Sequence, residues 1–419
     1  MIKSLYFTLK IDFMLRLSKI KGIKGRIKER PEDFIVEEID SSGNIIEINK
    51  EYSGFELNKV DNSGDFAVFI LQKRNWSTID ALLAIAKRLG RGKKSISYAG
   101  TKDRVSISTQ LASIYGIDPN LLREIKIKDI LINGAWRGNK VDLGSNLGNH
   151  FIIRIREPLI DDIDYIKEIY KEINGFFPNY FDVQRFGIRL NNARIGLFIM
   201  QNNLEEAMRE YLTSFNNENN LLAVEARKRL KEEWDFKKAL EYFPRYLKNE
   251  RRAISWLAKY KNDYAGAFRA IPRGITIMFI HAVEALIFNM ALELRIEYSD
   301  FKSPIYLDKN SYGFPSNELG AVFPAEAIIG YKTNEEEISH YSKEAMDRLG
   351  IKKEDFKIKS LPELSMKGSI RPILSPIKDF SISKEDNIII SFSIPSGSYA
   401  TILLNEFLDN ENISLEKFL

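Results

Sequence analysis

Strand-like segments at both ends of this chain enclose a long stretch of helical periodicity, and this order restricts how the chain can fold. The strand patterns occur at 33–39, 66–72, 105–111, 151–155 and 387–394. Residues from about 192 to about 360 show the charged, amphipathic spacing of helices instead. A chain that leaves β-rich structure and later returns to it predicts an α+β domain interrupted by a mainly helical insertion. We place this insertion at 204–367, between domain parts at 1–203 and 368–419.

Capping residues predict where several helices begin and end. Ser77 is followed three residues later by an aspartate, and the helix that it starts ends at Gly90. An amphipathic helix is predicted at 161–174, and Ser398 is predicted to cap a helix near the end of the chain. The aromatic segment 176–186 is predicted to be a loop.

The chain contains no cysteine, which excludes disulfides, thiolate nucleophiles and every cysteine-based metal site. The absence of cysteine fits a protein of a reducing compartment. Three histidines are too few and too scattered for a three-imidazole metal centre, and we expect each to be structural: His150, His281 and His340. There is no G-x-S-x-G elbow either. We therefore expect carboxylates, lysines or tyrosines to carry any chemistry, without a metal.

The most apolar long stretch of the chain runs from Ile275 to Leu294. His281, Glu284, Asn289 and Glu293 interrupt it, so it predicts a buried helix of a soluble protein rather than a membrane span. The N-terminus lacks the uninterrupted apolar block of a signal peptide. We expect a cytoplasmic protein without membrane association.

Positive charge is segregated into two clusters. Residues 1–30 contain nine cations and two carboxylates, and residues 87–104 contain seven cations and one carboxylate. Their net charges of +7 and +6 each exceed the +4 of the whole chain. Such clusters favour a phosphate backbone as partner, because each cation that neutralises a phosphate releases counterions. The alternative is a solvated helix face that serves solubility.

The segment from Tyr98 to Arg104 has the most chemical content. Asp103 lies between Lys102 and Arg104, and neighbouring cations favour the ionised carboxylate that a nucleophile or general base requires. The alternative is an ordinary turn, in which aspartate bonds local backbone amides.

The nearby segment from Gly90 to Ser95 resembles a phosphate-binding loop only superficially. The motif would require a glycine at position 87 and a hydroxyl residue at position 94, and both positions are lysines, Lys87 and Lys94. A nucleotide triphosphatase is therefore not expected.

Aromatic rings, amides and a guanidinium gather in the segment 176–187. Asn179, Phe181, Gln184 and Arg185 are the residue types that stack a flipped base and bond its edge. The alternative is that the rings belong to the core.

Together these segments resemble the TruD family of tRNA pseudouridine synthases. The motifs that carry the resemblance are Lys28-x-x-Pro-Glu-Asp-Phe34, Ala99-Gly-Thr-Lys-Asp-Arg104 with Thr109-Gln110, Gly148-Asn-x-Phe151, Asn179-Tyr-Phe-x-x-Gln-Arg-Phe-Gly187 and Phe392-x-x-Pro-Ser-Gly-Ser-Tyr-Ala-Thr401. Five motifs in this order are specific, although the resemblance is weak between about 205 and 365. It implies a pseudouridine-synthase-like domain with a mixed or antiparallel sheet and flanking helices, interrupted by the family's second domain.

The resemblance also implies an activity, the isomerisation of a uridine to pseudouridine at position 13 of tRNA, with no cofactor. Asp103 matches the catalytic aspartate, which attacks C1′ of the ribose or C6 of the base, and Lys28 matches the lysine that pairs with it. Further residues are expected to bind substrate: Asn179, Phe181, Phe392, Gln184, Arg185, Lys102, Arg104 and Phe34.

We expect tRNA as the partner, no nucleotide cofactor, and a monomer. Two alternatives remain at this point. One is a noncatalytic RNA-binding protein, and the other is an RNA hydrolase or transferase that uses Asp103 as its base.

Overall fold

A mixed eight-stranded sheet is the centre of the fold in the computed structural model, which describes residues 14–57, 60–158, 163–308, 322–384 and 386–409. The strand order is β12-β13-β6-β1-β4-β2-β5, with β3 paired to β4. The strands are β1 (Phe34–Ile39), β2 (Phe66–Arg74), β3 (Ile96–Tyr98), β4 (Ile107–Tyr115), β5 (Ile130–Gly138), β6 (Gly148–Ile155), β12 (Lys378–Lys384) and β13 (Ile388–Pro395).

The pairing of these strands confirms the predicted sheet type. β1 and β4 run parallel, and every other pair in this sheet is antiparallel. β13 pairs with β6, so that Phe392 lies opposite Phe151. The chain therefore returns to the first sheet after the long helical segment, as the strand patterns predict.

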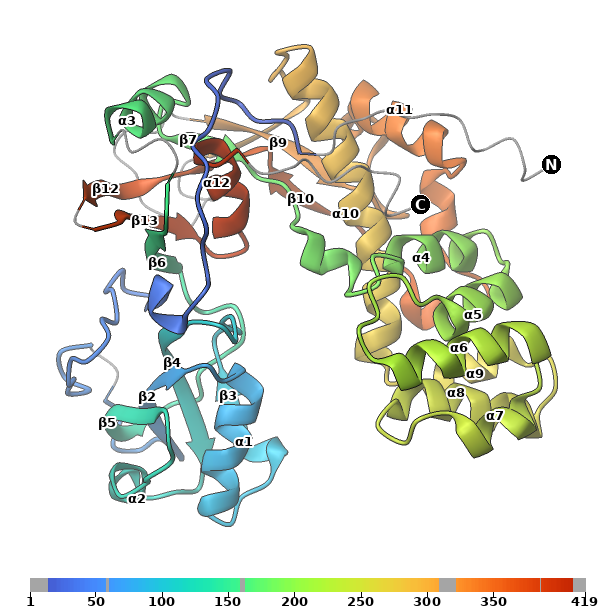
Figure 1. Cartoon of the computed structure of the whole chain (residues 1–419), viewed down its shortest axis with the longest axis horizontal. Helices are drawn as coiled ribbons and strands as arrows, with labels where there is room; N and C mark the ends of the chain where they lie inside the picture. Colours follow the sequence, from blue (N-terminus) through green and yellow to red (C-terminus); the bar gives the residue numbers. More distant parts are fainter. Residues whose placement is uncertain (1–13, 58–59, 159–162, 309–321, 385, 410–419) are drawn as a thin grey trace.

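Helices gather mainly in a second arm of the molecule, to the right in Figure 1, while α1 and α2 lie with β2, β4 and β5 in the other arm. The helices are α1 (Thr78–Arg88), α2 (Pro119–Arg123), α3 (Ile163–Glu172), α4 (Asn192–Met200), α5 (Leu204–Thr213), α6 (Leu221–Glu233), α7 (Phe236–Tyr242), α8 (Lys248–Lys259), α9 (Tyr264–Ala270), α10 (Arg273–Glu297), α11 (His340–Leu349) and α12 (Ala400–Phe407). In the same view β6, β13 and α12 join the two arms at the top.

The long apolar helix α10 is buried, as its interrupting polar residues predict. By length and composition α10 could cross a membrane, but 78% of its most apolar 18-residue window is buried inside the protein. Its residues belong to the same hydrophobic core as Phe34 and Ile153 of the sheet. This shared core connects the two arms.

Two short sheets accompany the helices. β8 (Ile305–Asp308), β9 (Val322–Ile328) and β10 (Ser369–Pro372) form one, and β7 (Phe176–Pro178) pairs with β11 (Leu374–Pro376) in the other. The predicted domain boundaries stay predictions. Helix α4, before the first boundary, packs against α10, and β10, after the second, pairs with β9.

Some of the predicted helix caps and loops are present in the structure and others are not. Ser77 accepts a hydrogen bond from the Asp80 backbone and caps α1, and Gly90 has the left-handed φ of +66° expected after a helix. Ser398 does not cap α12, because its hydroxyl bonds to Ser375 and Asn179 instead. The predicted loop 176–186 contains strand β7 and a short 3₁₀ helix, since its partner strand β11 lies almost 200 residues further along the chain.

A buried ion pair joins α10 to β9. Arg295 and Glu326 have side chains only 1% exposed, with Nη2 and Oε2 2.7 Å apart. Arg295→Met should lower the free energy of unfolding by about 3–5 kcal/mol, because it leaves the Glu326 carboxylate buried without its cation. Urea unfolding measures this loss.

The double variant Arg295→Met with Glu326→Met serves as the control, because it removes both charges. It should recover much of the loss, since a buried pair replaced by apolar groups is often near neutral. A single variant as stable as the unsubstituted protein would contradict this account of the pair.

Candidate active site

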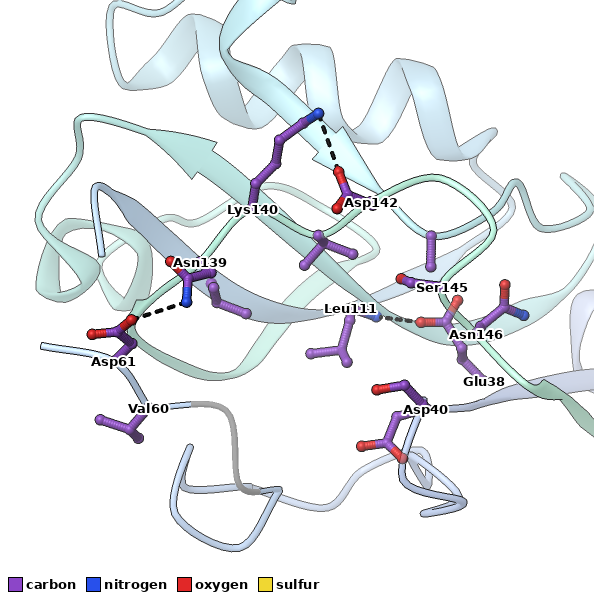
Figure 2. Close-up of a pocket in the computed structure, with 14 residues that line it drawn as sticks. Glu38, Asp40, Val60, Asp61, Leu111, Asn139, Lys140, Asp142, Ser145 and Asn146 are labelled. Carbon is purple, nitrogen blue, oxygen red and sulfur yellow. Dashed lines mark hydrogen bonds and ion pairs between the residues drawn. The ribbon is translucent and has the colours of Figure 1, made fainter. Parts of the chain in front are cut away.

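Two neighbouring pockets share Ala99 and Asn146, and their charges differ. The first, of about 320 Å³, is shown in Figure 2. Its walls carry four carboxylates: Glu38, Asp40, Asp61 and Asp142. Each already has a partner, such as Asn139 for Asp61 and Lys140 for Asp142. This acidic pocket would repel a phosphate group, so it does not suit an RNA substrate.

The second pocket has a volume of about 500 Å³, which suits a nucleoside. Four parts of the chain line it: the start of β1, the loop between β3 and β4, strand β6, and the turn before α12, with Asp182 and Gln184 at its edge. From the predicted site, Phe34, Lys102, Asp103, Arg104 and Gln184 are among the lining residues. Motifs far apart in the sequence therefore meet here.

Lys28 and Asp103 form an ion pair beside this pocket. Nζ of Lys28 lies 2.6 Å from Oδ2 of Asp103 and 3.8 Å from the ring centre of Phe34. Both charged side chains are partly shielded from solvent, at 24% and 35% exposed. Lys28 has a left-handed backbone with φ of +59°, a conformation that the surrounding structure must enforce for a residue other than glycine. The predicted pairing of Lys28 with Asp103 is present in the structure.

An anchored carboxylate holds the segment that carries Lys28. Asp33 is fully buried and accepts two hydrogen bonds from Arg156, at 2.8 and 2.7 Å, and one from the backbone of Arg30. Burial alone would raise the pKa of Asp33, but these hydrogen bonds and the arginine charges lower it below its ordinary value. Bidentate pairing of this kind fixes geometry, and so positions the neighbouring Lys28.

Lys73 holds the backbone of Asp103, and the sequence did not predict this residue as part of the site. Nζ of Lys73 donates to the Asp103 carbonyl at 2.7 Å, and the Ser106 hydroxyl donates to the same oxygen at 2.7 Å. Lys73 is fully buried in β2, and burial lowers its pKa to about 8. The signal that could have identified it is a lysine that directly follows the apolar run 66–71 in the same strand, between Gln72 and Arg74.

Lys102 does not act as a second cation for Asp103. Its Nζ pairs with buried Glu38 at 2.6 Å, and its side chain is only 3% exposed. Its backbone N–H donates to Thr78, and Gln110 donates to the carbonyl of Gly100. These contacts hold the loop in shape, so the sequence-based view of Lys102 as a neighbouring cation is wrong. The partner of Lys102 is Glu38 of β1, a buried carboxylate 64 residues away that the local sequence does not reveal.

Asp182 is a second carboxylate of the pocket that was not predicted. It accepts hydrogen bonds from Thr401 at 2.7 Å and from the backbone of Val183 at 2.6 Å. Burial raises the pKa of Asp182, an effect that the nearby charge of Lys28 opposes. Its place inside the motif that begins at Asn179 was the available signal.

Asn179 and Phe181 lie beside the pocket rather than in its lining. The Asn179 side chain is occupied: it donates to the Pro372 carbonyl at 3.0 Å and accepts from Arg371 at 2.7 Å. The guanidinium groups of Arg371 and Arg185 both lie over the Phe181 ring, at 4.1 and 5.2 Å from its centre. Arg371 also donates to the carbonyl of Gly397 and so ties this segment to the turn that lines the pocket.

Phe392 does not border the pocket. It is fully buried and stacks on Phe151 with ring centres 5.4 Å apart. Phe151 in turn packs edge-on against Phe34 at 5.8 Å, and these two rings line the pocket. Phe392 therefore supports the aromatic floor from behind. The β13–β6 register places it there, and a sequence motif alone does not specify register.

The structure also places Arg104, Gln184 and His150. Arg104 and Gln184 are exposed at the rim of the pocket. His150 lies between the hydroxyls of Ser391 and Ser393, which confirms a structural role. Within the described ranges, no group of three or more side chains could hold a metal ion.

The buried ammonium of Lys73 makes a prediction about pH. Its pKa lies below that of an exposed lysine, so the unfolded chain binds more protons between pH 8 and about 10.5. Below pH 8 the buried charge of Lys73 lowers the free energy of unfolding by its full amount. This loss is relieved as the pH rises from 8 to about 10.5. Relative to Lys73→Met, the unsubstituted protein should gain roughly 3 kcal/mol of unfolding free energy across the window.

Urea unfolding at a series of pH values measures this difference. Lys140→Met is the matched control: because Lys140 is exposed and Lys73 is kept, the unsubstituted protein should gain nothing relative to this variant across the same window. Parallel pH profiles for the Lys73 variant and the unsubstituted protein would contradict the burial of a charged lysine.

The chain is similar to proteins of one known family over most of its length. The model of the family described as tRNA pseudouridine synthase D (TruD) matches residues 10–312 and 314–407. A "Probable tRNA pseudouridine synthase D" of Methanococcus maripaludis is 35% identical over 399 residues, covering 92% of this chain and 95% of that protein. One from Methanopyrus kandleri is 32% identical and covers 84% of this chain and 87% of that protein.

A solved structure is also similar. The crystal structure of a protein assigned as TruD from Methanosarcina mazei has a TM-score of 0.74 and 28% sequence identity, and the match covers 96% of this chain and 97% of that one. Sequence and fold agree over nearly the whole chain, and the chain therefore belongs to the TruD family of tRNA pseudouridine synthases.

Proposed function

We propose that this protein isomerises uridine 13 of tRNA to pseudouridine and that the Asp103 carboxylate is its catalytic group. The observation that carries the proposal is the Lys28–Asp103 pair beside an aromatic-floored pocket of nucleoside size. A uridine in a folded tRNA reaches such a pocket by flipping out of its stack. Phe34 and Phe151 offer the rings against which its base packs.

The chemistry requires one bond to break and another to form. The C1′–N1 bond of the uridine breaks, a C1′–C5 bond forms, C5 loses a proton and N1 gains one, so that the composition of the nucleotide does not change. Asp103 attacks C1′ or C6 as a carboxylate nucleophile. Lys28 orients this carboxylate through their ion pair, while Asp182 supplies a second carboxylate for proton transfer.

The charge of the surrounding surface supports an RNA substrate. The cations of the second sequence cluster other than Lys102 are exposed, and they lie along α1 and the loops that follow it. In the first cluster, Lys19, Lys24 and Arg30 are exposed, while Lys3 and Lys10 lie outside the described residues. Lys28 of the first cluster lies beside this pocket and Arg104 of the second cluster lines it, so phosphates that flank a flipped uridine would meet positive charge.

Asp103→Asn should abolish the reaction while leaving tRNA affinity nearly unchanged. Asparagine keeps the size of aspartate but removes the charge and the reactive lone pair that a nucleophile or base needs. We expect the single-turnover rate to fall at least roughly a thousandfold. Tritium release from tRNA labelled at C5 of uridine measures the rate, and filter binding measures the affinity.

Two controls make this test specific. Asp142→Asn changes a carboxylate of the neighbouring acidic pocket and should behave like the unsubstituted enzyme. A transcript with cytidine at position 13 should release no tritium from that position. Substantial tritium release by a folded Asp103→Asn protein would refute the role of Asp103. If the unsubstituted protein binds tRNA but releases no tritium, the result would favour a noncatalytic RNA-binding protein.

A further inference from the structure

A basic groove crosses the outer part of the helical arm, and it shares no residue with the candidate active site. Its volume is about 710 Å³. It is formed by the end of α7, by α8 and by the end of α9, which lie at the lower end of this arm in Figure 1, away from α12. Five cations line it, and none of its lining residues is a carboxylate: Arg245, Lys248, Arg251, Arg252 and Lys259.

The positive charge of this groove is not balanced by carboxylates of the residues that the structure describes. Within the described part of the chain, none of the five forms an ion pair with a carboxylate. Other cations of the same arm are paired, for example Arg227 with Glu250 and Arg229 with Glu233. Exposed Lys248 and Arg252 are one helical turn apart, and like charges at this spacing destabilise a helix. The positive charge of the groove therefore does not stabilise helix α8.

Part of the groove is also held in place before any partner binds. Nη1 of Arg251 donates to the carbonyls of Leu240 and Phe243, at 3.0 and 2.5 Å. The indole of Trp256 donates to Asp263 at 3.0 Å and packs against the Tyr260 ring with centres 4.6 Å apart. The Tyr260 side chain is 42% exposed, so a ring is available next to the cations.

We propose that this groove binds the sugar–phosphate backbone of the tRNA substrate, at a segment outside the arm that carries the target uridine. This inference rests on the proposed function. Charge complementarity identifies the occupant, because unpaired arginines next to an exposed ring suit a phosphate chain with accessible bases. The groove lies in a different arm from the Asp103 loop, so we expect an RNA that fills both to extend beyond the stem–loop that carries the target uridine.

The test uses the double variant Arg252→Glu with Lys259→Glu in the full chain. For full-length tRNA we expect at least a tenfold rise in Kd and KM, with kcat at saturation unchanged. The slope of log K against log salt should shrink by roughly 1.4 to 1.8, because each of the two lost phosphate contacts removes about 0.7 to 0.9. For a stem–loop RNA that contains only the target arm, Kd and KM should stay the same.

The matched control is Lys332→Glu with Lys343→Glu, which reverses two exposed charges elsewhere in the arm and should change none of these values. The neutral variant Arg252→Gln with Lys259→Gln should show a smaller loss in the same direction. Unchanged tRNA affinity, an equal loss with the control variant, or an equal loss on the stem–loop would each overturn the proposal. Unchanged affinity would leave an acidic protein as the partner instead.

Binding and catalysis separate this inference from the proposed function. If the unsubstituted enzyme releases no tritium, the proposed function fails, but the affinity and salt dependence still report on the groove. If tritium release is normal and the charge reversal leaves Kd and KM unchanged, the groove proposal fails alone.

Discussion

The contact between Lys28 and Asp103 is the interaction on which the candidate site depends. It joins the segment before β1 to the loop between β3 and β4, two parts of the chain that no local signal connects. Each partner is fixed separately. Asp33 and Arg156 hold the segment of Lys28, and Lys73 and Ser106 hold the backbone of Asp103. Preorganisation of this kind places a carboxylate before substrate arrives, and this lowers the barrier of a reaction at that carboxylate.

Charge is sorted within a small region around this pair. Carboxylates line the neighbouring acidic pocket, where Glu38 also neutralises Lys102, while the exposed cation Arg104 lines the pocket that contains Asp103. The basic groove along α8, whose five cations form no ion pair with a carboxylate of the described residues, lies in the other arm. Because a long RNA carries charge along its whole length, two such surfaces fit one extended polyanion better than a small substrate.

The sequence predicted much of this fold because its signals were local. Strand alternation, the Ser77 cap and the polar breaks in the helix that became α10 each act within a few residues. The pairing of Lys28 with Asp103 was also predicted, although only by resemblance to a family. What failed depends on distant partners. Ser398 bonds to Asn179 instead of capping α12, and Phe392 is buried behind Phe151 because of strand register.

The most direct measurement of the central claim is the single-turnover rate of Lys28→Met at saturating enzyme, compared with Lys28→Arg and the unsubstituted protein. Methionine keeps the approximate length of the side chain but removes the cation next to Asp103. The account predicts a rate at least about a hundredfold lower for methionine, with tRNA affinity little changed and partial recovery in arginine. A methionine variant that is as fast as the unsubstituted enzyme would contradict the account, because the ion pair would then contribute nothing to the reaction.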